Sequence, residues 1–97
     1  QGIGRVCADA TAIKPLFASS QSIALSQAAF PRYTNLDSYK MAACSIDTAV
    51  RNLVVLGADI KKIALLDNFC WCSPEEKERL YQLKKALADS FQSYPVN

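Results

Sequence analysis

The chain is organised around residues Leu36 to Trp71, LDSYKMAACSIDTAVRNLVVLGADIKKIALLDNFCW, where its apolar content is densest. Apolar residues recur here at helical spacing: Tyr39, Ala42, Ala43, Ile46, Ala49, Val50, Leu53 and Val54. A further set widens this stripe beyond one face: Met41, Cys44, Val55 and Leu56. A helix that is apolar on most sides belongs in the middle of a bundle. The stretch therefore predicts a core helix and not a catalytic site.

Length and composition indicate a single globular domain over residues 1–97. Hydrophobic residues make up 51% of the chain and charged residues 21%, which is typical of a folded protein and not of a disordered one. The net charge of +2 is spread in mixed sign, and the lysine pairs 61–62 and 84–85 are too isolated to predict a nucleic-acid partner. No apolar run approaches the roughly 20 residues of a membrane span.

The chain begins at Gln1, and no charged and apolar leader precedes it. This start fits a mature chain whose secretory signal has been removed, so we expect a secreted, extracellular protein.

Four cysteines, an even number in a short chain, point to disulfides in an oxidising compartment. They are Cys7, Cys44, Cys70 and Cys72. A zinc site is disfavoured because the sequence has no histidine and only one close cysteine pair, so no metal is expected. Two pairings stay open: Cys7 with Cys70 and Cys44 with Cys72, or Cys7 with Cys72 and Cys44 with Cys70.

The N-terminal third predicts a helix that begins near Ala8 and is interrupted at Pro15. Two readings follow: a kinked helix, or a turn and then a helix from Pro15 to about Ala29. The loop 31–35 comes next, with Thr34 or Asn35 as the N-cap of the central helix, Leu36 to Leu56.

Gly57 is the expected residue just after the central helix, and Asp59 the expected cap of a helix from Ile60 to about Phe69. The residues 73–76, Ser-Pro-Glu-Glu, form a capping box that begins a last helix, which Pro95 ends. No run alternates convincingly with period two, so no strand is expected. The predicted fold is all-α, a four- to five-helix bundle stapled by two disulfides.

Catalytic groups are scarce in this sequence. It contains no histidine, and no serine or cysteine lies in a nucleophile motif, so we expect a protein that is not an enzyme and needs no cofactor. Trp71, between two cysteines, either plugs one end of the bundle or lines a mouth for a ligand. The candidate ligand-binding residues are Tyr39, Met41, Leu53, Trp71 and Phe91.

The segment 39–45, Tyr-Lys-Met-Ala-Ala-Cys-Ser, resembles the start of a central helix in elicitins, with one residue inserted. Elicitins are secreted sterol-carrying proteins. The positions of Cys7, Cys44 and Cys70 give a looser resemblance to secretoglobins, which are small secreted helical proteins. Both resemblances imply a secreted carrier of an apolar small molecule.

The predicted function is therefore a secreted binding protein, which carries a small lipid or sterol or acts as an extracellular elicitor or effector. The alternative is an effector, toxin or signalling protein without a ligand cavity, recognised by a protein receptor through its surface. An empty apolar pocket favours the carrier, whereas a solid core with an exposed apolar patch favours the effector.

Overall fold

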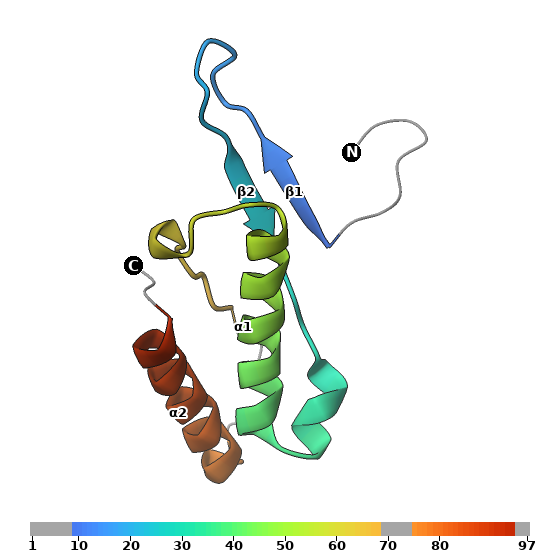
Figure 1. Cartoon of the computed structure of the whole chain (residues 1–97). Helices are drawn as coiled ribbons and strands as arrows, with labels where there is room; N and C mark the ends of the chain where they lie inside the picture. The colour runs from blue at the N-terminus through green and yellow to red at the C-terminus, as the bar shows by residue number, and fades with distance from the viewer. Residues whose placement is uncertain (1–8, 69–74, 95–97) are drawn as a thin grey trace.

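The computed structural model describes residues 9–68 and 75–94, which form two helices and a two-stranded hairpin. In chain order the elements are β1 (Ala10–Ile13), β2 (Ile23–Ser26), the 3-10 helix η1 (Pro31–Asn35), α1 (Ser38–Val55), the 3-10 helix η2 (Ile60–Lys62) and α2 (Lys77–Ser93). Figure 1 shows α1 and α2 side by side and the hairpin projecting past one end of α1. Within the described ranges, no helix is long and apolar enough to cross a bilayer.

The N-terminal third is a β-hairpin, so the prediction of an all-α bundle is wrong. β1 and β2 pair antiparallel, with Thr11 opposite Leu25 and Ile13 opposite Ile23. Thr and Ile are β-branched and suit extended backbone, and Pro15 lies in the connecting loop instead of kinking a helix. In β2 the exposure alternates with period two, which is the strand pattern that a helical reading overlooks.

The central helix is present as α1, slightly shorter than predicted. Its N-cap is Asp37, and not Thr34 or Asn35, because the Asp37 carboxylate accepts the backbone N–H of Lys40 at 2.9 Å. Those two residues belong instead to η1, whose start is packed by the stacked rings of Phe30 and Tyr33, 5.2 Å apart.

Gly57 ends α1 as the sequence predicts. It has a φ of +87°, and its N–H donates to the Val54 carbonyl while that of Ala58 donates to the Leu53 carbonyl. These two bonds define a Schellman motif, in which a left-handed residue satisfies the last carbonyls of a helix.

The predicted helix from Ile60 to Phe69 shrinks to the single 3-10 turn η2. Asp59 does cap it, accepting the N–H of Lys61 at 3.0 Å. Beyond the turn the backbone is extended at Ile63, which is 4% exposed, whereas Leu66 is 94% exposed. Burial alternates over residues 63–66, as expected of an extended chain and not of a helix. Ile63 therefore packs into the core from an extended segment.

The core lies between α1 and α2. One cluster of buried residues comprises Met41, Ala42, Leu83 and Ala86, and a second comprises Ile46, Val50 and Ile63. The small Ala42 and Ala86, each 1% exposed, allow close approach of the two helices. α2 begins at Lys77 and not at Pro74, which with Ser73 and Pro95 lies outside the described residues.

The predicted pair of disulfides is also corrected. Both pairings require Cys44, which is an exposed free thiol on α1. Cys7, Cys70 and Cys72 lie outside the described residues. The helix pair is therefore held by packing and hydrogen bonds, and that the 97 residues form one domain stays a prediction.

Candidate functional site

Two tyrosine–aspartate hydrogen bonds join the polar rims of α1 and α2. Tyr39 of α1 donates its hydroxyl to Asp89 of α2 at 2.8 Å, and Tyr94, just after α2, donates to Asp47 of α1 at 2.6 Å. Residue numbers rise along both helices from one bond to the next, so α1 and α2 run in the same direction, as the colours of Figure 1 also show.

Charges reinforce both bonds. Nε of Arg51 lies 2.6 Å from the second oxygen of Asp47, and this bond, followed by that from Tyr94, lowers the pKa of Asp47. The hydrogen bond to Asp89 raises the pKa of Tyr39, and Nζ of Lys85 lies 5.3 Å from the centre of the Tyr39 ring. The hydrogen bond to Asp47 likewise raises the pKa of Tyr94, so at neutral pH both tyrosines keep the proton that they donate. Because the pKa of Asp47 is lowered, Tyr94 donates to an ionised carboxylate, which makes a stronger hydrogen bond than a neutral acceptor.

A polar hollow of about 360 Å³ lies where the first turn of α1 faces the first turns of α2. Its lining residues are Thr34, Asn35, Leu36, Asp37, Ser38, Glu78, Arg79 and Gln82. The backbone N–H of Lys40 lowers the pKa of Asp37, so this carboxylate is anionic. Arg79 pairs with Glu76 at 3.0 Å, and Gln82 donates to Glu78 at 2.9 Å. The charged side chains of this hollow thus already have partners, whereas the buried hydroxyl of Ser38 has none among the described residues.

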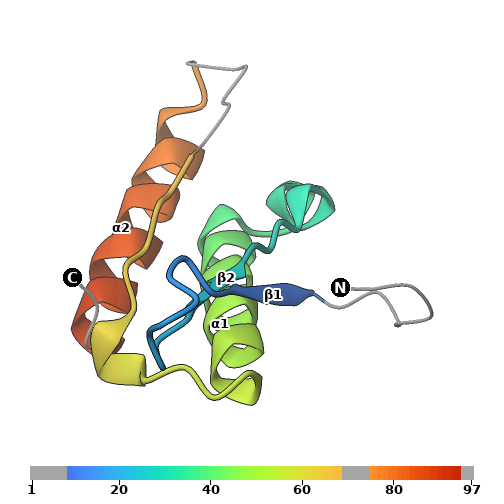
Figure 2. The ribbon, with the colours of Figure 1, turned by 90° about the horizontal axis from the view of Figure 1, so that it is seen from above.

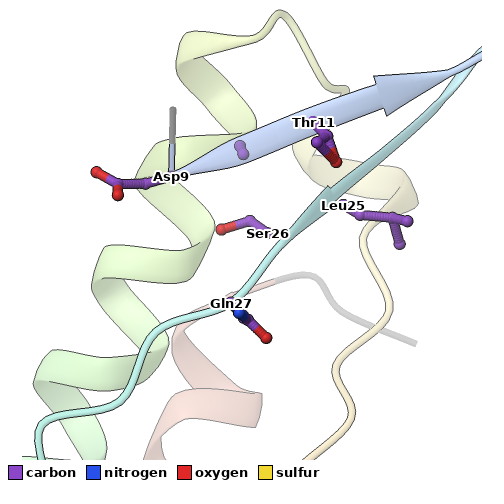
Figure 3. Close-up of a pocket in the computed structure, with 6 residues that line it drawn as sticks. Asp9, Thr11, Leu25, Ser26 and Gln27 are labelled. Carbon is purple, nitrogen blue, oxygen red and sulfur yellow. The ribbon is translucent and has the colours of Figure 1, made fainter. Parts of the chain in front are cut away.

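A second hollow, of about 430 Å³, lies along the hairpin and is lined by Asp9, Ala10, Thr11, Leu25, Ser26 and Gln27 (Figure 3). The side chains of Ser26 and Leu25 point to opposite sides of the strand. The hydroxyl of Ser26 is buried without a hydrogen-bond partner. It can still donate to, or accept from, a group that enters this hollow.

Of the five residues predicted to bind a ligand, the four that the structure describes do not line either hollow. Met41 is in the first core cluster and Leu53 packs on the second, while Phe91 is 50% exposed on α2. Tyr39 is held by Asp89, and Trp71 lies outside the described residues. A ligand-binding role of these five residues stays a prediction.

Sequence reasoning missed the residues of the polar hollow. Asp37 and Glu78 meet only through the packing of α1 on α2, and no local pattern links them. Within residues 9–68 and 75–94, no three His, Cys, Asp or Glu residues lie close enough together to bind a metal ion.

Comparison with known proteins finds similarity to a synthase. The phosphoribosylformylglycinamidine synthase subunit PurL of Methanocaldococcus jannaschii is 39% identical over 77 residues, covering 76% of this chain and 10% of the relative. The corresponding subunit of Methanococcus aeolicus is 35% identical over 79 residues, covering 81% and 10%. That of Deinococcus radiodurans is 35% identical over 69 residues, covering 71% and 9%. No family model and no solved structure matches the chain.

These similarities overturn the resemblance to elicitins and secretoglobins, and with it the predicted function as a carrier or effector. The expectation of a non-enzymatic protein is also wrong, because the chain is similar to a segment of an enzyme subunit. The chain spans about a tenth of the length of these relatives. The predicted secretion stays a prediction.

Proposed function

We propose that this chain corresponds to a segment of a phosphoribosylformylglycinamidine synthase subunit and contributes structure to an enzyme of that kind. The observation that carries this proposal is the 39% identity over 77 residues with the Methanocaldococcus jannaschii subunit. The similarity covers 76% of this chain, so it is far longer than one short motif.

The exposed apolar surface supports this proposal. Phe17 is 92% exposed, Leu66 94%, Val55 86% and Leu36 85%. Burying such side chains against another part of an enzyme would be favourable. The radius of gyration, 15.7 Å, also exceeds the value of about 13 Å typical of a compact domain of 100 residues. Both observations fit a unit that packs against further parts of a larger enzyme.

The helix pair is the part best suited to act as a scaffold. Its two tyrosine–aspartate bonds and its core fix α1 and α2, which in turn hold the polar hollow and the hairpin in place. A small apolar ligand, a protein receptor and an absence of nucleic-acid binding stay predictions.

A chimeric enzyme tests the proposal. The matched segment of the Methanocaldococcus jannaschii subunit is replaced with the matched residues of this chain, and formation of phosphoribosylformylglycinamidine is followed by mass spectrometry. We expect a soluble chimera that retains synthase activity, because a replacement segment with 39% identity should keep most of the original contacts.

The matched control is the same chimera with Ala42→Asp, which places an unpaired charge in the core between α1 and α2 and should abolish activity. A chimera that is folded and soluble by circular dichroism but no more active than this control would contradict the proposal.

A further inference from the structure

The hairpin presents one edge and one face that nothing in the described residues covers. β1 pairs only with β2 in the part of the chain that the structure describes, so its other edge is open. β2 runs beside α1, whereas β1 lies on the outer side of the hairpin (Figures 1 and 2). Two-stranded sheets are marginally stable by themselves and are stabilised by further strands or by packing against a helix, which here contacts mainly β2.

The open edge lacks charge, proline and a bulge, and its short length of four residues is the one protective feature that it has. Natural edge strands carry lysine, proline or a bulge that discourages a further strand. Residues 10–13, Ala-Thr-Ala-Ile, contain no charge and no proline, and their pairing with β2 is continuous over four residue pairs. Each alternate N–H and C=O of β1 is thus free to bond an incoming backbone.

The outer face of the hairpin adds side-chain specificity. Residues directly opposite each other share a face, so Ile13, Ile23 and Leu25 form one apolar row, 48%, 49% and 54% exposed. The opposite face carries only small residues, Ala10, Ala12, Ala24 and Ser26, and all of them except Ala12 are partly buried. A strand added beside β1 would continue both patterns if it carried apolar residues on the outer side and small residues on the other.

We infer that the open edge of β1 receives a β-strand from the remaining part of a synthase-sized polypeptide, an inference that rests on the proposed function. The occupant is an extended segment with apolar residues at alternate positions. The relatives supply the chain length for it, since the matched region is only about a tenth of each. The hollow lined by Asp9, Ser26 and Gln27 offers polar groups that the added segment could contact.

Amide hydrogen exchange of the 97-residue chain and of the chimera tests the inference. In the chain alone, the two amides of β1 that point away from β2 should exchange freely. In the chimera they should exchange at least about tenfold more slowly, because an added strand bonds them. The two β1 amides bonded to β2 are the internal control.

A pair of variants of the chimera isolates the apolar row. Ile13→Lys puts a charge on the outer face and should restore fast exchange at the open edge. Gln21→Lys adds the same charge in the exposed loop between β1 and β2 and should leave the exchange unchanged.

The outcomes separate the two proposals. An active chimera whose outer β1 amides exchange as fast as in the chain alone overturns the inferred added strand and leaves the proposed function intact. A folded, inactive chimera counts against the proposed function.

Protection that appears in the chain alone and grows with its concentration identifies a second copy as the occupant and also overturns the inference. If the chimera is insoluble, the labelled 97-residue chain is mixed with the archaeal subunit lacking the matched segment, and unchanged β1 exchange overturns the inference.

Discussion

The helix pair and the hairpin differ in how far they bury their apolar side chains. α1 and α2 bury Met41, Ala42, Leu83 and Ala86 against each other, and two tyrosine–aspartate bonds close the rims of this core. The hairpin leaves its larger apolar side chains, Ile13, Ile23 and Leu25, about half exposed. Stability of the chain alone should therefore come from the helix pair, while the hairpin offers surface to a neighbour.

Truncation of the helix core is the strongest test of this contrast. Leu83 is 2% exposed, so Leu83→Ala should lower the free energy of unfolding by about 2–4 kcal/mol through lost burial and a residual cavity. Urea denaturation followed by circular dichroism measures it. Leu80→Ala, on the same helix but 38% exposed, is the control and should cost clearly less.

Removing one rim hydroxyl should have a smaller effect. Tyr94→Phe deletes the bond to Asp47 and should lower the free energy of unfolding by about 1 kcal/mol, since the bond is partly exposed. Tyr81→Phe, at an exposed tyrosine on α2, should change it little. Equal effects of the two substitutions would show that the rim bond does not stabilise the helix pair.

Acid should weaken the same rim. The pKa of Asp47 in the folded protein lies below its ordinary value of 3.8, so its contribution is fully present above pH 3.8 and is lost as the pH falls through the lower folded value. Denaturation midpoints between pH 6 and pH 2 should therefore fall less steeply in Asp47→Asn than in the unchanged chain. Identical pH profiles would contradict the role of Asp47.

The end of α1 allows a test of backbone conformation alone. A Cβ at Gly57 would meet nothing within 4 Å, so Gly57→Ala should cost about 1 kcal/mol only through the left-handed backbone at φ +87°. Gly57→Asn should cost less, because asparagine tolerates this conformation better. Thermal melts of both variants measure the difference, and an alanine variant as stable as the parent would exclude strain at this turn.

The smallest change is expected in the hairpin. Leu25→Thr should alter the free energy of unfolding of the 97-residue chain by about 0.5 kcal/mol or less, because Leu25 is 54% exposed and threonine suits a strand. Urea denaturation serves again. A loss of unfolding free energy as large as that of Leu83→Ala would show that the hairpin stabilises the chain as much as the helix core does.

The sequence predicted the features that depend on neighbours along the chain. α1, the glycine at its end and the Asp59 cap all follow from local spacing and backbone chemistry. The hairpin was missed because Ile23, Ala24 and Gln27 also recur at helical spacing. Only the pairing of β2 with β1 decides between helix and strand. The extended chain at Ile63 was missed for the same reason, since its burial comes from packing in the second core cluster.

The candidate site was harder to predict than the fold. Met41 lies in the helix core and Leu53 packs against it, and a ligand-binding role of these residues stays a prediction. The resemblance over residues 39–45 was misleading because a match over seven residues of a helix also occurs between unrelated proteins. The polar hollow, in contrast, joins residues some forty positions apart, and no single-sequence pattern marks such a meeting.

The two rim bonds also have a consequence for how the chain folds. Tyr39 and Asp89 are 50 residues apart, and Asp47 and Tyr94 are 47 apart, so each bond closes a long loop. The entropy lost in closing such a loop grows only slowly with its length, but it must be lost before any contact compensates. Because the two loops overlap almost completely, the first bond brings the second pair together at little further cost. The parallel helices should therefore join in one cooperative step, limited by a single loop closure.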